Sequence, residues 1–201
     1  MPRYFNKFPM LSYTRDGVSN IATDLMTRIS VIKNSVDEKS IFYQYDIQEG
    51  DTPEIIASKY YNDPELHWVV LVFNNIFDPF YDWPMTYLQF SEYIADKYGS
   101  QADALETVHH YEKIVTSIDG YSGTATVNKY IVDLNTYTNL IESSTTKTFE
   151  NGYSVTVNIT KRIVDCYTYE EELNESKRKI NLLKKDLIPD IKNQFKQLMG
   201  A

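Results

Sequence analysis

The sequence has little cysteine and glycine and no long apolar run, and each shortage excludes a class of protein. The single cysteine, Cys166, excludes an intramolecular disulfide framework and fits synthesis in a reducing compartment. The 7 glycines are scattered, so no Gly-rich phosphate-binding loop is formed. No run reaches the ~18 apolar residues that a membrane span needs, and the first residues lack the apolar region of a signal peptide. We therefore expect neither a membrane protein nor an exported one.

Basic residues are also few, whereas tyrosine is abundant. The chain has 20 Lys and Arg against 28 Asp and Glu, a net charge of −8, which argues against a general nucleic-acid binder because such proteins need a basic face. Tyrosine accounts for 17 of the 201 residues. Many tyrosines pack in cores, but the excess favours an extensive contact surface, since tyrosine is enriched at protein interfaces. The length allows one or two domains.

Residues 43–83 are the most informative stretch, because a small folding unit can be read from them. Alternation over residues 42–47 predicts a strand with one aromatic face. Thr52 and Pro53 then fit the N-cap and first position of a helix, and Asp63 with Pro64 starts a second, mostly buried helix over residues 66–73. After a stop at Asn74, residues 80–83 are predicted to return as a strand beside the first one, which gives a β-α-α-β unit.

Two sets of residues in this stretch resemble known families. Tyr45-x-Ile47-x-x-Gly50-Asp51-Thr52, followed by Ile56-Ala57, Tyr60, Trp68 and Asn74, resembles a LysM domain, a small module best known for holding N-acetylglucosamine glycans. The longer set is more specific. It adds Pro53-Glu54-Ile55, Tyr61, His67, Val69 and Asn75-Ile76-x-Asp78-Pro79-Phe80-Tyr81-x-Trp83-Pro84, and it resembles the baseplate wedge subunits of T4-like contractile-tail phages, the products of gene fifty-three.

The resemblance implies a function in assembly. The chain would be a structural, non-enzymatic subunit of the virion, synthesised in the host cytoplasm and placed in the tail baseplate. Its partners would be the other wedge proteins and the neighbouring wedges, with six copies per baseplate, no nucleic acid and no membrane. It would fasten wedge proteins and join adjacent wedges around the hub during tail assembly.

We expect an α+β chain of five successive segments. These are an N-terminal arm (1–40), the LysM-like domain (41–85), a helix and polar linker (86–105), a small antiparallel β region (106–168) and a C-terminal helical segment (169–201). Asp16-Gly17, Asp119-Gly120 and Asn151-Gly152 predict turns, whereas the polar run at 143–146 predicts a loop. The apolar spacing after residue 169 predicts an amphipathic helix that Pro189 breaks near residues 186–188.

Two apolar segments lack an obvious place to be buried. The arm is either docked on the chain's own core or reserved for a neighbour, and the C-terminal helix packs either on the small sheet or on a partner. We favour partners for both. The expected interaction residues are Phe5, Phe8, Leu11, Phe80, Tyr81, Trp83, Ile191 and Phe195.

No set of residues converges on chemistry, so we expect no catalytic residue, metal or cofactor. His109-His110-x-Glu112 is the one cluster of possible ligands, but adjacent strand residues point to opposite faces, so a structural role is expected. His67 and Cys166 are expected to be packed residues. The alternative function is a peptidoglycan-binding LysM module, whose groove would include Gly50, Asp51, Thr52, Asn74 and Asn75. We do not expect glycan binding, because the aromatic exit differs from that of ordinary LysM repeats.

Overall fold

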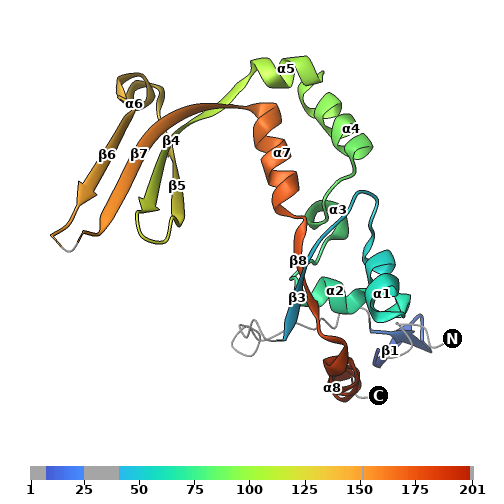
Figure 1. Ribbon diagram of the computed structural model, residues 1–201. Coiled ribbons are helices and arrows are strands. Elements are labelled where there is room, and N and C mark those ends of the chain that lie inside the picture. Colours follow the sequence, from blue (N-terminus) through green and yellow to red (C-terminus); the bar gives the residue numbers. More distant parts are fainter. Residues whose placement is uncertain (1–7, 25–40, 151, 200–201) are drawn as a thin grey trace. The chain divides into compact units, whose positions relative to one another are not determined.

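The computed structural model describes residues 8–24, 41–150 and 152–199, and it confirms a mixed α+β fold with small antiparallel sheets (Figure 1). The chain forms two compact units, residues 1–86 with 175–201 (unit 1) and residues 87–174 (unit 2). The C-terminal segment expected at 169–201 is thus divided between them.

The described helices and strands follow this division. Unit 1 contains β1 (Met10–Arg15), β2 (Val18–Thr23), β3 (Phe42–Asp46), α1 (Pro53–Tyr61), η3 (Pro64–Leu66), α2 (His67–Phe73), α3 (Pro79–Asp82), β8 (Lys179–Leu183), η4 (Lys185–Leu187) and α8 (Ile188–Met199). Unit 2 contains α4 (Tyr87–Tyr98), α5 (Gln101–Glu106), β4 (Val108–Asp119), β5 (Ala125–Val132), α6 (Leu134–Asn139), β6 (Ser143–Thr148) and β7 (Ser154–Asp165), and α7 (Cys166–Ser176) runs across the boundary.

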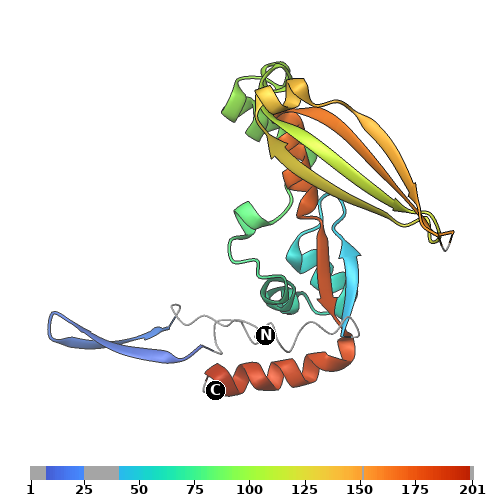
Figure 2. The same cartoon turned by 90° about the vertical axis from the view of Figure 1, so that its left-hand side faces the viewer.

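A two-stranded sheet of β3 and β8 forms the centre of unit 1 (Figure 2). The strands are antiparallel, with Phe42 opposite Leu183 and Asp46 opposite Lys179. The expected β-α-α-β order is present, but its second strand comes from the far end of the chain. The prediction that residues 80–83 form this strand is wrong: they lie in α3, because Asp78 caps that helix by accepting from Phe80 N and Pro79 occupies its first turn.

The helices of unit 1 begin where the sequence predicts and bury one apolar face. Thr52 accepts a hydrogen bond from Ile55 N at the start of α1, and Asp63 accepts one from Glu65 N at the start of η3. The buried apolar core of unit 1 consists of Ile47, Ile56, Ala57, Leu66, Trp68, Val69, Val70, Ile180, Leu182, Leu183, Ile188 and Phe195.

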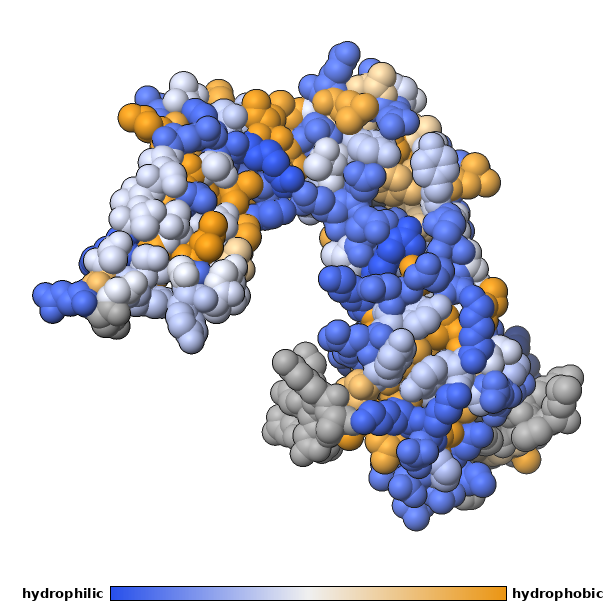
Figure 3. All heavy atoms as spheres, in the orientation of Figure 1, coloured by the Kyte–Doolittle hydropathy of each residue, from blue (hydrophilic) through white to orange (hydrophobic). Residues whose placement is uncertain are grey.

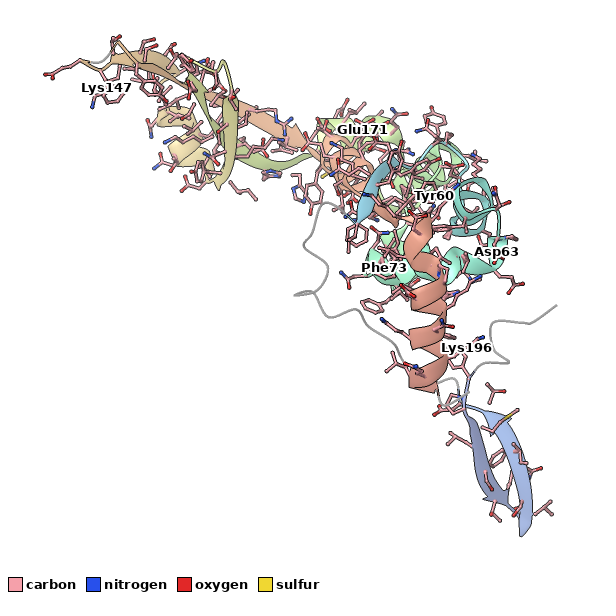
Figure 4. The ribbon with its side chains drawn as sticks, turned by 60° about the horizontal axis from the view of Figure 1, so that its bottom comes forward. Tyr60, Asp63, Phe73, Lys147, Glu171 and Lys196 are labelled. Carbon is pink, nitrogen blue, oxygen red and sulfur yellow. The ribbon has the colours of Figure 1, made fainter. Side chains whose placement is uncertain are left out.

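Aromatic pairs fix β3 against the two helices. Tyr43 stacks on Tyr60 of α1 with ring centroids 5.9 Å apart, and Phe42 meets Phe73 of α2 edge to face, also at 5.9 Å. Figure 4 labels Tyr60 and Phe73, one on each helix. These two contacts join β3 to both helices.

The C-terminal helical prediction is wrong in its middle. Residues 179–183 form β8, and Pro189 lies in the first turn of α8, where a proline fits. The steps between Ile180, Leu183 and Leu187 fit a helix, but Ile180 and Leu182 also alternate around the exposed Asn181, and pairing with β3 selects the strand.

In the arm, Asp16 and Gly17 form the predicted turn of a hairpin between β1 and β2. Both have positive φ, 53° and 78°, as a tight two-residue turn requires. The spacing of Ile21, Leu25, Met26, Ile29 and Ile32 fits either a helix or a strand, and Ile21 lies in strand β2. The other apolar residues of that series, Leu25, Met26, Ile29 and Ile32, lie outside the described residues.

Unit 2 is built on an antiparallel sheet with the strand order β5-β4-β7-β6. The turns at Asp119-Gly120 and near Gly152 connect its strands as predicted, but residues 143–148 form β6 instead of a loop, because they pair with β7. Residues 101–106 likewise form α5 instead of a linker, since Ser100 caps them by accepting from Asp103 N.

Helix α4 packs on α7 through Phe90, whose ring lies 5.5 Å from that of Tyr167. The spacing of Phe90, Ile94 and Tyr98 predicts a helical apolar stripe that ends at Gly99. Phe90 and Ile94 are buried on α4, Tyr98 is half-buried, and Gly99 follows the helix with a φ of 90°. Along the sheet itself apolar atoms remain at the surface, as Figure 3 shows, and they include Val127 and Ile131 of β5.

Candidate functional site

The loop that joins β3 to α1 is held by the carboxylate of Asp51. This side chain is buried and accepts hydrogen bonds from Tyr45 Oη (2.7 Å), Gln48 N (3.2 Å) and Lys59 Nζ (2.6 Å). Its backbone carbonyl accepts from Trp83 Nε1 at 2.9 Å. One short acidic residue therefore ties the strand, the loop, α1 and the aromatic segment after α3 together.

The electrostatics agree with this structural role. Burial acts to raise the pKa of the Asp51 carboxyl, but the hydrogen bonds from Lys59 and Tyr45 outweigh it and hold that pKa below its ordinary value. Burial, together with the hydrogen bond to Asp51, raises the pKa of Tyr45 to about 12. An ionised Asp51 beside a neutral Tyr45 is a stable arrangement and not a proton-transfer pair at neutral pH.

The other side of the predicted groove is formed by Asn74 and Asn75. The Asn74 side chain donates to Val70 O (2.8 Å) and Asn181 O (2.9 Å) and accepts from Asn181 N (2.8 Å). Asn75 has a φ of 55°, the left-handed conformation that asparagine tolerates. A shallow hollow of about 270 Å³ lies beside them, bordered also by Ile76, Asp82, Lys177, Lys179 and Ile180.

The predicted groove residues are thus largely engaged within the chain. Thr52 caps α1, Asp51 and Asn74 make the bonds above, and Gly50 has a φ of 78° in the turn. These side chains offer few free hydrogen-bonding groups to a sugar.

Three large aromatic side chains stand out on and around α3. Phe77, Phe80 and Tyr81 are 65%, 91% and 76% exposed. The segment under them is firmly held: Asp82 Oδ2 accepts from Phe77 N (3.2 Å) and Asp78 N (3.1 Å), and Lys177 Nζ donates to Tyr81 O (2.6 Å). A well-anchored turn therefore presents apolar surface to solvent. Phe80 and Tyr81 were expected from the sequence; Phe77 was missed, although it stands in the quoted motif as the variable position before Asp78-Pro79.

The other predicted interaction residues differ in exposure. Leu11 is 50% exposed on β1, whereas Phe195 is 2% exposed and its ring lies 4.7 Å from that of Trp68. Phe8 is half-buried with its ring 6.3 Å from Phe195. Trp83 and Ile191 are half-buried against the core of unit 1, and Phe5 lies outside the described residues. Among the described members of this set, Leu11, Phe80 and Tyr81 are open to a partner.

The histidine pair in unit 2 is arranged differently from the expectation. Val108 lies opposite Asp165 and His110 opposite Val164, so His109 is an extra residue in a bulge, and the two imidazoles contact each other through Nδ1 atoms 2.7 Å apart. His109 also stacks on Tyr169, with centroids 3.8 Å apart. Across the described chain, no group of three or more His, Cys, Asp or Glu is placed to hold a metal ion.

The sequence analysis did not predict the exposed aromatic residue at the tip of the unit 2 sheet. Tyr121 is 93% exposed directly after the Asp119-Gly120 turn. Asp119 Oδ1 accepts from Tyr121 N (2.8 Å), and its Oδ2 accepts from Tyr153 Oη (3.0 Å), so one carboxylate joins the two hairpin tips. An aromatic residue following a strong turn signal was the available clue.

Helices long and apolar enough to cross a membrane are lacking in the described part of the chain. A family model described as base plate wedge protein 53 matches residues 14–199. A search of curated proteins gives no match.

Proposed function

Because the chain belongs to the base plate wedge protein 53 family, we propose that it is a non-enzymatic subunit that fastens wedge proteins and joins adjacent wedges around the hub of a phage contractile tail. The family match carries this proposal, since it includes nearly all of both units. We also propose six copies per baseplate, as the resemblance to the wedge subunits of T4-like phages implies.

Exposed apolar surface on held elements supports an assembly function. Phe80 stands on the capped helix α3, and the β1–β2 hairpin exposes Leu11, Tyr13, Val18 and Ile21 by half or more. An isolated two-stranded hairpin is marginally stable in water, because it buries little apolar surface. Both apolar surfaces are therefore expected to be stabilised when another protein covers them and removes them from water.

Because no residue of β1 or β2 belongs to the described core of unit 1, we expect that the hairpin can be replaced without loss of stability. Asp24 N donates to Pro9 O at 2.8 Å, so the two ends of the hairpin already lie together, and Phe8 is retained next to Phe195. Replacing residues 10–23 with a Gly-Ser link should leave the melting temperature of the isolated chain unchanged and should block incorporation into wedges. Normal incorporation of this variant, measured on purified tail particles, would refute the role of the hairpin.

A matched variant separates the apolar surface from the hairpin backbone. Leu11 and Arg15 lie on the same face of β1, because they are four residues apart in the strand. Arg15 is opposite Val18 of β2, so Leu11 and Val18 lie on one face of the hairpin. Replacing both by serine should weaken incorporation as well, whereas Ser12→Thr with Ser19→Thr on the other face should not.

The glycan-binding alternative is tested by a pull-down on purified peptidoglycan. We propose no glycan function, because Asp51, Thr52 and Asn74 make hydrogen bonds within the chain. Saturable binding that chitin oligomers compete away would favour a LysM module instead. Co-purification with tail particles, without such binding, favours the wedge.

A further inference from the structure

The two edges of the β3–β8 sheet differ in whether their outward backbone groups are hydrogen-bonded. On the β8 edge, the Asn74 amide occupies both backbone groups of Asn181. A side chain thus blocks the position where another strand would pair. Such blocking is one way in which proteins prevent unwanted pairing at a sheet edge.

On the β3 edge a side chain bonds to one outward group at the end of the strand, since Gln48 Nε2 donates to Asp46 O at 2.7 Å, but among the described residues the middle of the strand has no such bond. Ile47 N donates to Arg178 O at 2.9 Å, so this pair is hydrogen-bonded within the sheet. Hydrogen-bonded and non-hydrogen-bonded pairs alternate in an antiparallel ladder, so the pair of Gln44 and Asn181, three steps away, is of the second kind. The N–H and C=O of Gln44 therefore point away from β8, and no described residue bonds to them.

We propose that this edge receives an extended strand from another wedge protein, which turns the two-stranded sheet into a three-stranded one. The inference rests on the proposed function, because the partner is taken from the same assembly. Addition of a strand to an open edge obtains affinity from main-chain hydrogen bonds, and neighbouring side chains select the sequence. The backbone of Gln44 supplies the central pair of these bonds.

The side chains along the edge indicate what the added strand contains. Asp46 is exposed and already has Lys179 opposite it on β8, and a Lys or Arg at the facing position of the added strand would complement its charge from the other side. Tyr43 is 55% exposed and stacks on Tyr60, which offers an apolar surface on the opposite face. Because Asp46 and Tyr43 are three residues apart, the added strand would carry a basic residue and an apolar one three positions apart.

Gln44→Pro tests the edge directly. Proline removes the outward N–H and is tolerated in a strand where that N–H does not pair, so the sheet itself should survive. Gln44→Thr is the matched control, because it alters the side chain and keeps the N–H. Each variant is co-expressed with the other wedge proteins of the same phage, and incorporation and the melting temperature of the isolated chain are measured.

We expect the proline variant to unfold as the wild type does and to be incorporated at least about 10-fold less, whereas the threonine variant behaves normally. Wild-type incorporation of the proline variant would overturn the inference. So would a lowered melting temperature of the isolated proline variant, since the edge would then already be used within the chain. If the wild type itself fails to enter wedges, the proposed function fails, which is a distinct result.

The charge of the added strand is tested by Asp46→Lys. This substitution should lower incorporation, and raising the salt concentration should narrow the difference from the wild type because it screens the repulsion. The melting temperature of the isolated variant is measured as well, because the new lysine also faces Lys179 of β8 and a marked loss of stability would explain poor incorporation without a partner strand. This temperature should stay close to that of the wild type. Asp96→Lys on α4 makes the same change in net charge at an exposed position of unit 2 and serves as the control. Equal incorporation of the two variants would contradict a basic residue opposite Asp46.

Discussion

The side chain of Asn74 is hydrogen-bonded to the backbone of Asn181, although the two residues are 107 positions apart in the chain. The bonds measure 2.9 Å from Nδ2 to Asn181 O and 2.8 Å from Asn181 N to Oδ1. They join the end of α2 to β8. One side-chain amide therefore holds β8 in place and occupies the backbone groups on its outer edge.

Asn74→Ala should therefore lower the free energy of unfolding of unit 1 by ~0.5–1.5 kcal/mol, because the exposed backbone groups of Asn181 exchange their partner for water. The two tryptophans, Trp68 and Trp83, both lie in unit 1, so denaturant unfolding followed by tryptophan fluorescence reports on this unit. Asn193→Ala, at an exposed position of α8, is the control. Equal stability of the two variants would show that the Asn74 bonds are dispensable.

Phe195→Ala should cost ~3–5 kcal/mol, since it removes a buried ring that packs on Trp68. Leu198→Ala, one turn further along the helix at a position 71% exposed, should change stability by less than ~0.5 kcal/mol. The same fluorescence measurement compares them. A small effect of Phe195→Ala in the isolated chain would mean that α8 is not part of the core of unit 1.

Glu170→Gln should make the stability of unit 2 change less as the pH is lowered into the acid range. Burial acts to raise the pKa of the Glu170 carboxyl, but the hydrogen bonds from Lys97 Nζ (2.6 Å) and Tyr98 Oη (2.9 Å) outweigh it and lower that pKa. The ionised carboxylate thus stabilises the fold at pH values above ~4.3, the ordinary pKa of glutamate, and this contribution disappears as the pH falls through the lowered value.

Thermal unfolding followed by circular dichroism at several pH values measures this effect. The wild type should be more stable than the Glu170→Gln variant at neutral pH, and the difference should vanish in acid. Glu92→Gln, at an exposed position of α4, should track the wild type throughout. A difference that persists unchanged at low pH would show that the carboxylate charge is not what stabilises the fold.

Gly120→Ala should destabilise unit 2 by ~1–3 kcal/mol, because the new methyl group would collide with its neighbour. Gly120 N donates to Ser154 O at 2.8 Å, and a Cβ at position 120 would come within 2.8 Å of that same oxygen. Tyr121→Ala, at the exposed residue that follows, should leave stability unchanged. Thermal unfolding of the two variants is the test, and equal melting temperatures would contradict the close approach of the hairpin tips.

Local signals in the sequence predicted the helix starts and turns of this fold well. Thr52 and Asp63 cap helices as expected, and Asp16-Gly17 turns a hairpin, because each signal acts over only a few residues. Long-range pairing was not predictable in this way. Ile180 and Leu183 satisfy both helical and extended spacing, and the choice of β8 depends on β3, more than 100 residues earlier.

At the candidate site, too, local features could be predicted from the sequence and long-range contacts could not. The motif at Gly50-Asp51-Thr52 was found, but its spacing did not reveal that Asp51 would be buried under Tyr45 and Lys59. Exposure of Phe80 followed from an aromatic residue in a short Asp-Pro segment, whereas burial of Phe195 depends on Trp68, which no local pattern connects to it. The bulge at His109 likewise arises from pairing with β7.

The separation of β3 from β8 in the chain also dictates an order of events during translation. All of unit 2 leaves the ribosome before β8 does, so that unit can fold while β3 still lacks its partner. Any nascent chain that terminates before residue 183 exposes Trp68 and the apolar helix around it, which are features that chaperones and proteases recognise. The β3–β8 sheet therefore cannot form until residues 179–183 have been synthesised.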